Sequence, residues 1–105
     1  MRNGRTTAKP RVVVLGGGIS GLVAAHELAK QSGRFEVIVL EAGARAGGKV
    51  RSETVDGQVV ETGPDSFITT KPEMLELVRE LGLAGELIGT GPDAGVSVLL
   101  GGRLT

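Results

Sequence analysis

The stretch RVVVLGGGISG, residues 11–21, decides which fold the sequence predicts. Its aliphatic half predicts a strand over Arg11–Leu15, buried on both faces and ended by three glycines. From Ile19 to about Gln31 apolar residues recur at helical spacing, and Ser32-Gly33 predicts where this helix stops. Phe35–Leu40 predicts a second buried strand. Strand, helix and strand in this order predict an α/β fold with a βαβ unit whose strands are parallel.

The glycines between the first strand and the helix have the spacing Gly16-x-Gly18-x-x-Gly21. In a dinucleotide-binding βαβ unit the first glycine makes a tight turn, the second admits a pyrophosphate and the third lets helix and strand pack closely. The free N–H groups at the helix start favour the phosphates. The candidate phosphate-binding residues are therefore Gly16, Gly17, Gly18, Ile19, Ser20 and Gly21.

Glu41 follows the second strand, twenty residues after Gly21, and Ala42 follows it. A carboxylate at this place accepts hydrogen bonds from both ribose hydroxyls of an adenosine, and it repels a 2′-phosphate. The alternative is a solvated glutamate at a strand end. The glycines and Glu41 together predict a dinucleotide site without choosing the dinucleotide.

Further along, two strands over Val50–Val55 and Gln58–Glu61 flank Asp56-Gly57, a strong hairpin signal. Residues 63–66, Gly-Pro-Asp-Ser, predict a turn. Residues 70–73, Thr-Lys-Pro-Glu, predict a capping box that opens a helix ending at Gly82. Its apolar stripe comprises Met74, Leu77, Val78 and Leu81.

The last segment predicts a strand over Val96–Leu100, with Gly101-Gly102 turning into a return strand from Arg103. Because the sequence stops inside this hairpin, we expect the chain to be a portion of a larger protein. We expect residues 1–10 to be a flexible basic leader and residues 11–105 to be one dinucleotide-binding domain.

Composition narrows the function classes. The 105 residues carry no net charge, which gives no general attraction to nucleic acid or to an anionic membrane. With no cysteine and one histidine, the sequence predicts no disulfide framework and no metal site. We expect no membrane-spanning segment, because glycines break the apolar stretch after the leader. The absence of cysteine fits a cytoplasmic protein, and peripheral membrane association stays open.

Residues 45–52, RAGGKVRS, resemble the R-x-G-G-R-x-x-[TS] segment of the amine-oxidase-like flavoprotein superfamily. This resemblance implies FAD as the cofactor, with Arg45, Gly48 and Lys49 along its pyrophosphate. Paired glycines expose backbone amides and flanking cations balance the diphosphate charge. Lys49 stands where the superfamily often has arginine, so it supplies a point charge without a bidentate fork.

Residues 61–67, ETGPDSF, resemble the E-x-G-P-[DN]-S-F stretch of the porphyrinogen oxidases of heme biosynthesis. The resemblance implies that Gly63, Pro64, Asp65 and Ser66 lie near the flavin end of FAD. It implies a Rossmann-like FAD-binding βαβ unit with a β-hairpin insertion, in the N-terminal part of a two-domain flavoenzyme. Such an enzyme oxidises protoporphyrinogen or coproporphyrinogen to the porphyrin, with dioxygen as acceptor and hydrogen peroxide as product.

Three alternatives remain at this point. The chain is another member of the superfamily, such as an amine oxidase or a carotenoid desaturase; or it is an NAD-binding module without flavin; or the 105 residues alone have no activity. The sequence identifies no catalytic residue. His26 and Lys71 are most simply interpreted as surface residues of their helices, although Lys71 could face a substrate propionate.

Overall fold

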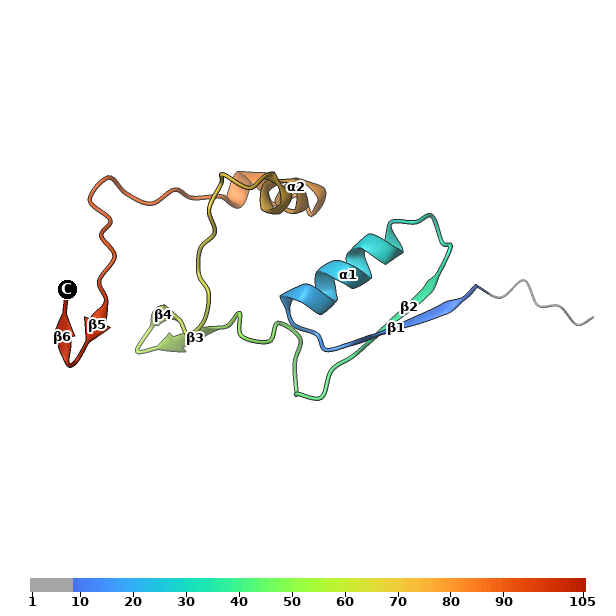
Figure 1. Cartoon of the computed structure of the whole chain (residues 1–105), viewed down its shortest axis with the longest axis horizontal. Helices are drawn as coiled ribbons and strands as arrows, with labels where there is room; N and C mark the ends of the chain where they lie inside the picture. The colour runs from blue at the N-terminus through green and yellow to red at the C-terminus, as the bar shows by residue number, and fades with distance from the viewer. Residues whose placement is uncertain (1–8) are drawn as a thin grey trace, which may run out of the picture. The chain divides into compact units, whose positions relative to one another are not determined.

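The computed structural model describes residues 9–105 of the chain (Figure 1). These residues form two compact units, the first ending at Ser66 and the second beginning at Phe67. Both units mix helices and strands, so the α/β composition expected from the sequence is confirmed. The predicted basic leader falls mainly on residues 1–8, which lie outside the described residues.

The first unit begins with a strand, a helix and a strand: β1 (Arg11–Leu15), α1 (Ile19–Ala29) and β2 (Glu36–Leu40). The strands are parallel, in a register that pairs the first and last residues of β1 with those of β2, as the βαβ prediction requires. The helix contacts both strands and ends two residues before the expected Gln31. Ser32 and Gly33 then adopt φ of 47° and 72°, the left-handed conformation that turns the chain back toward β2.

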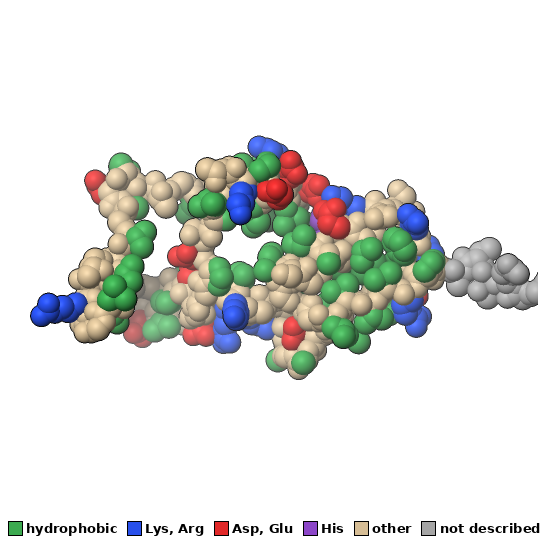
Figure 2. All heavy atoms as spheres, in the orientation of Figure 1, with side chains coloured by type: hydrophobic (Ala, Val, Ile, Leu, Met, Phe, Trp, Pro, Cys, Tyr) green, Lys and Arg blue, Asp and Glu red, His purple; other side chains and the backbone are tan. Residues whose placement is uncertain are grey.

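The prediction that β1 is buried on both faces is wrong for the residues described here. Val12 and Val14 are half-buried, whereas Val13 and Leu15 are 47% and 80% exposed. The cause is that α1 covers one face of the strand pair, and no other element among residues 9–105 contacts β1. Apolar side chains therefore gather on the surface of this unit (Figure 2).

A β-hairpin follows in the first unit, made of β3 (Ser52–Val55) and β4 (Gln58–Glu61). Asp56 and Gly57 have φ of 50° and 78°, the two positive values that an Asp-Gly hairpin turn adopts. The hairpin signal at these two residues is thus confirmed. Its first strand starts at Ser52, two residues after the expected Val50.

The second unit contains α2 (Pro72–Glu80), a short 3₁₀ helix η1 (Ala84–Glu86) and the hairpin of β5 (Leu99–Leu100) and β6 (Arg103–Leu104). The last hairpin turns at Gly101-Gly102 as predicted, with φ of 55° and 81°. The strand before it is shorter than the expected Val96–Leu100.

The capping box predicted at Thr70 is wrong. The N-cap of α2 is Lys71, which has no side-chain capping bond, and Pro72 is the first helical residue. Proline suits the first helical position and forces the residue before it into extended conformation, so Lys71 takes the cap position with φ −105° and ψ 122°. A lysine has no acceptor atom and cannot bond the free N–H groups.

α2 ends at Glu80, with Leu81 as its C-cap, and Gly82, whose φ is 72°, follows as the glycine expected to stop it. On the expected apolar stripe Met74 and Leu77 are half-buried, and so is Leu75 beside it. Val78 on this stripe is 7% exposed, while Leu81 remains 51% exposed. Neither helix in the described part of the chain is long and apolar enough to span a bilayer.

Candidate functional site

The turn between β1 and α1 is built entirely from main chain. Gly16 has φ of 99°, and its N–H donates to the Leu40 carbonyl at 2.7 Å, so it continues the strand pairing while it reverses the chain. Gly18 is the N-cap of α1 in extended conformation, and no side chain caps the helix. The first N–H groups of α1 are thus open to an acceptor from outside the helix.

Gly21 fixes how closely α1 approaches this turn. A Cβ at position 21 would overlap the carbonyl oxygen of Gly16 and come within 3.3 Å of Val14 Cγ1. Real Cβ atoms essentially never tolerate such an overlap, so only glycine allows this packing of helix on strand. The close-packing role predicted for Gly21 agrees with this geometry.

The loop that follows β2 folds back onto the same turn. The Gly47 N–H donates to the Gly17 carbonyl at 2.7 Å. Gly48 has φ of 58°, and a Cβ on it would lie 3.0 Å from Gly18 Cα. The two glycine segments, far apart in the sequence, therefore pack main chain against main chain.

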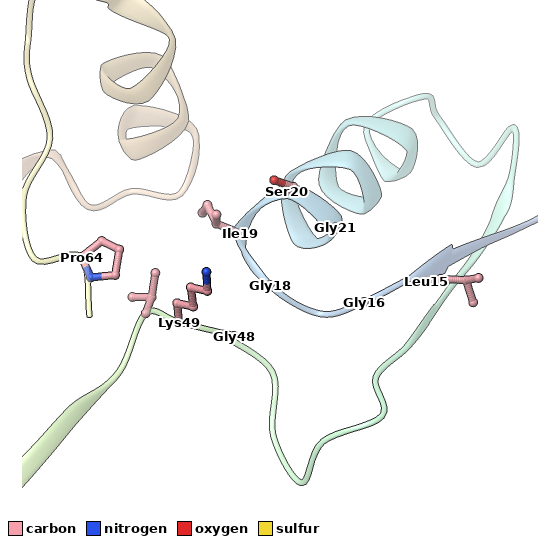
Figure 3. A pocket seen from close by; sticks show the side chains of 11 residues that line it. Leu15, Gly16, Gly18, Ile19, Ser20, Gly21, Gly48, Lys49 and Pro64 are labelled. Carbon is pink, nitrogen blue, oxygen red and sulfur yellow. The ribbon is translucent and has the colours of Figure 1, made fainter. Parts of the chain in front are cut away.

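Together these segments form an open cleft of about 440 Å³, which we call the glycine cleft (Figure 3). It is lined by Leu15, Gly16, Gly18, Ile19, Ser20, Gly21, Gly47, Gly48, Lys49, Val50 and Pro64. The amino group of Lys49 points into the space between Pro64 and Ile19 (Figure 3). Lys49 is the charged residue of this lining, so the cleft offers backbone N–H groups and one cation, a combination suited to an anion.

Glu41, directly after β2, bonds the glycine turn before α1 and the start of its own loop. One carboxylate oxygen accepts from the Gly17 N–H at 2.9 Å and the other accepts from the Gly43 N–H at 2.5 Å. The Gly43 N–H, and after it the Gly17 N–H, hold the pKa of Glu41 below its usual value. Partial loss of solvent opposes them with a smaller effect, and the charge of Arg45 adds the smallest lowering of the pKa. An ionised carboxylate can accept about four hydrogen bonds, so ribose hydroxyls remain possible partners.

The segment after β4 passes beside the glycine cleft. A Cβ on Gly63 would overlap the carbonyl oxygen of Lys49, so the two backbones touch there. Pro64 lines the cleft, whereas the Ser66 hydroxyl donates to the Asp65 carboxylate at 3.1 Å. The predicted turn over residues 63–66 is wrong. The chain bends at Gly63 and then continues without regular structure, because Gly63 is held against the backbone of Lys49.

The structure thus brings together many of the residues singled out in the sequence, eight of which line the cleft: Gly16, Gly18, Ile19, Ser20, Gly21, Gly48, Lys49 and Pro64. Three others contact lining residues: Gly17 bonds Gly47, Arg45 bonds Gly48, and Gly63 touches Lys49. Glu41 bonds Gly17 and Gly43, which are not part of the lining. Ala42, Asp65 and Ser66 are exposed and outside it. Sequence reasoning missed Leu15, Gly47 and Val50 as lining residues, although Leu15 adjoins a glycine run, Gly47 belongs to one and Val50 follows Lys49.

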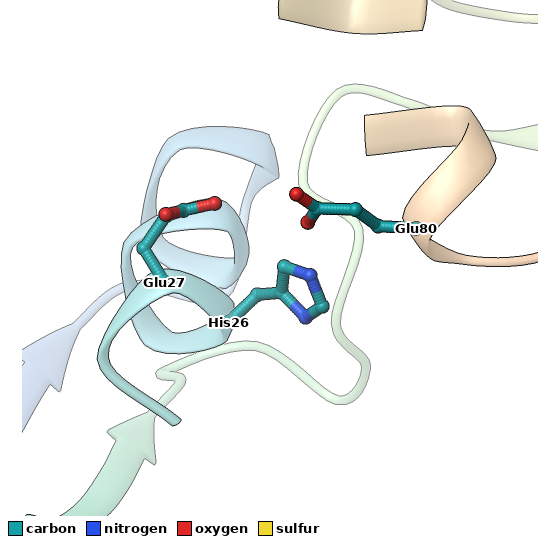
Figure 4. Close-up of side chains that lie close together, drawn as sticks. All are labelled: His26, Glu27 and Glu80. Atoms are coloured by element: carbon teal, nitrogen blue, oxygen red, sulfur yellow. The ribbon is translucent and has the colours of Figure 1, made fainter. Parts of the chain in front are cut away.

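Three further titratable side chains are drawn in Figure 4: His26 and Glu27 belong to α1, and Glu80 belongs to α2. Glu27 on α1 accepts from the Lys30 ammonium at 2.9 Å, an ordinary pair one helical turn apart, and His26 precedes it. Glu80 is the last residue of α2, on the exposed side of that helix. None of these is adjacent in sequence to the residues that form the glycine cleft.

Comparison with known proteins matches residues 19–104 to a family described as flavin containing amine oxidoreductase. A coproporphyrinogen III oxidase from Propionibacterium freudenreichii subsp. freudenreichii is 44% identical over 93 residues, which are 89% of this chain and 17% of that protein. Polyamine oxidase 1 from Oryza sativa subsp. japonica is 42% identical over 108 residues, covering 91% of this chain and 21% of that protein.

Among solved structures, a protein described as a protoporphyrinogen oxidase from Exiguobacterium sp. 255-15 superposes with a TM-score of 0.68 at 38% identity. The superposition covers 76% of this chain and 18% of that chain. The chain therefore spans only about one fifth of the length of the relatives it matches.

Proposed function

The chain belongs to the flavin containing amine oxidoreductase family, and on that premise we propose that it is the FAD-binding portion of a porphyrinogen oxidase. The observation that carries the proposal is the packing of the Gly47-Gly48 segment against the Gly16–Gly18 turn, with Lys49 facing the cleft between them. An NAD module needs the first glycine segment but not the second.

The residues present fit the diphosphate half of FAD. At positions 18 and 48 a Cβ would reduce the space where the two main chains meet, and glycine leaves the backbone N–H groups accessible. The start of α1 adds N–H groups and a partial positive charge, and Lys49 adds a full one. Glu41, at the carboxyl end of β2, is assigned to the adenosine ribose, and Ala42 lies beside it.

Bound FAD would supply the redox chemistry, which in this proposal removes hydride equivalents from a porphyrinogen and passes electrons to dioxygen, giving hydrogen peroxide. The role of the described residues is to bind and orient the cofactor. Pro64, with Gly63 held against Lys49, is assigned to the cleft edge toward the flavin ring, and Asp65 and Ser66 to the exposed segment beyond it. No catalytic residue is assigned among residues 9–105.

The names of the relatives support the substrate class. Coproporphyrinogen III oxidases from several bacteria are 38–44% identical to this chain, in agreement with the ETGPDSF segment. The second candidate is a polyamine-type amine oxidase, favoured by the 42% identity to the rice enzyme and by a putrescine oxidase structure that superposes with a TM-score of 0.63. The choice between protoporphyrinogen and coproporphyrinogen is left to experiment.

The test uses the full-length protein. Purified protein should show flavin absorbance, and porphyrin fluorescence should rise with coproporphyrinogen III or protoporphyrinogen IX and dioxygen. Putrescine and spermidine are supplied in parallel, with peroxide release as the readout. Peroxide from an amine without porphyrin from either porphyrinogen would replace the proposal by the second candidate, and a protein without flavin would refute both.

A further inference from the structure

Arg45 has an arrangement that differs from the role its motif implies. Its guanidinium is turned onto the loop of which it is part: Nη1 donates to the Ala46 carbonyl at 2.9 Å and to the Val50 carbonyl at 3.4 Å, and Nη2 donates to the Gly48 carbonyl at 3.2 Å. Lys49, by contrast, lines the glycine cleft, and Arg45 does not. Arg45 and Lys49 thus face different partners.

The planar fork of arginine is what permits this arrangement. Its five N–H donors lie in one plane and can bond several carbonyl oxygens at once, whereas a lysine ammonium is a compact charge on a flexible stem. Gly47 makes room for the fork. A Cβ on Gly47 would lie 2.7 Å from Arg45 Nη1 and 3.2 Å from the Val50 carbonyl oxygen, and its φ of 113° strains any other residue.

The bonds from Arg45 to these carbonyls fix the orientation of the peptide units that contain them. With the oxygens of residues 46, 48 and 50 bonded to the guanidinium, the Gly47 N–H reaches the Gly17 carbonyl. The N–H groups of Gly48 and Lys49 donate to no acceptor within residues 9–105, and both residues line the cleft. The Lys49 N–H shares its peptide unit with the Gly48 carbonyl, so the bond from Arg45 turns this N–H away from the guanidinium and leaves it available to an anionic ligand. The Gly48 N–H shares its peptide unit with the Gly47 carbonyl, which accepts instead from the Val50 N–H.

We infer that Arg45 is a positioning residue, which fixes the Gly47-Gly48 turn against the Gly16–Gly18 turn, and that Lys49 is the cation that faces the diphosphate. The first half concerns the protein alone. The second half rests on the proposed FAD site.

The experiment compares R45A, R45K and K49A with the wild type in the full-length protein. Hydrogen exchange of residues 45–50 is measured in flavin-free protein, and FAD affinity is measured over a series of salt concentrations. R45A and R45K should both speed exchange of the segment by roughly tenfold, since each loses several hydrogen bonds. Both should weaken FAD while the salt dependence of binding stays that of the wild type.

K49A should leave the exchange of residues 45–50 unchanged and flatten the salt dependence of FAD binding, because it removes a charge that salt screens. The inference is overturned if R45K keeps both the slow exchange and the wild-type affinity, or if R45A flattens the salt dependence as K49A does. If R45A does not fold, R45K decides the question. Absence of FAD binding by the wild type would refute the proposed function, while the exchange data would still test the positioning role.

Discussion

The two units of the chain differ in how far their hydrogen bonds reach along the sequence. In the first unit, Gly16 bonds Leu40, Gly47 bonds Gly17, and Gly17 bonds Glu41, so the partners are at least 24 residues apart. In the second unit, the backbone bonds outside the helices and strands join residues at most seven apart. Geometry in the first unit therefore depends on main-chain contacts between distant segments, while the second follows local sequence patterns.

The largest effect should come from placing a methyl group at the closest main-chain contact of the first unit. We expect Gly21→Ala to lower the free energy of unfolding by about 3 kcal/mol and to reduce flavin content, because its Cβ overlaps the Gly16 carbonyl. Denaturant unfolding and flavin absorbance of the full-length protein measure both. The matched control is Gly85→Ala in η1, where no atom lies within 4 Å of the new Cβ. Equal losses in the two variants would remove the contrast between the units.

The next effect should come from the buried side chain of the second unit. Val78→Ala is expected to cost about 2 kcal/mol of stability through lost packing of α2, with FAD affinity unchanged within about twofold. Val96→Ala serves as control, since Val96 is 90% exposed in the same unit. A loss of FAD affinity as large as that of Gly21→Ala would mean that the second unit shapes the cofactor site.

Lowering the pH should destabilise the first unit by protonating Glu41. Because the pKa of Glu41 is lowered in the folded protein, its ionised form stabilises the fold at and above its usual value of 4.5, and this contribution is lost as pH falls further, through the lowered pKa. FAD affinity, followed by fluorescence between about pH 7 and pH 3, should hold down to about pH 4.5 and fall below it. Glu41→Gln should weaken FAD about tenfold at neutral pH and remove the acid-dependent part. The control Glu73→Gln should keep the acid-dependent loss of FAD affinity. If Glu41→Gln also kept this loss, the acid effect would belong to another group.

The smallest effect should come from the ion pair between the two parallel strands. Arg11 Nε lies 3.0 Å from a Glu36 carboxylate oxygen, but the side chains are 62% and 50% exposed. A double-mutant cycle with Arg11→Ala and Glu36→Ala should give a coupling below about 1 kcal/mol. A larger coupling would show that side chains, and not only main chain, hold β1 to β2.

The sequence predicted the local elements well because their causes are local. Asp56-Gly57 and Gly101-Gly102 supply the positive φ values of their turns, and the glycine spacing identified the turn before α1. The capping box at Thr70 failed because Pro72 carries a competing signal, and proline at the first helical position determined the outcome.

The features that the sequence did not predict depend on which distant segments of the chain come into contact. The motif that contains Arg45 indicates a charge near phosphate, but only the folded loop shows its guanidinium on three carbonyls. Likewise, nothing in the sequence of residues 63–66 indicates that Gly63 presses on Lys49, and that contact replaced the expected turn. Burial of β1 on both faces could not follow from its apolar residues alone, because burial depends on what else packs there.

A cleft made of backbone has a consequence for how such a protein tolerates genetic variation. Apart from Lys49 and the Ser20 hydroxyl, the lining offers main-chain groups and apolar surface, and a peptide N–H is the same in every residue but proline. Substitutions at Leu15, Ile19 or Val50 would leave the backbone donors in place, whereas a single added carbon at position 21 would not. Codon changes at a few glycines should therefore be far more damaging than changes at most of the side chains around them.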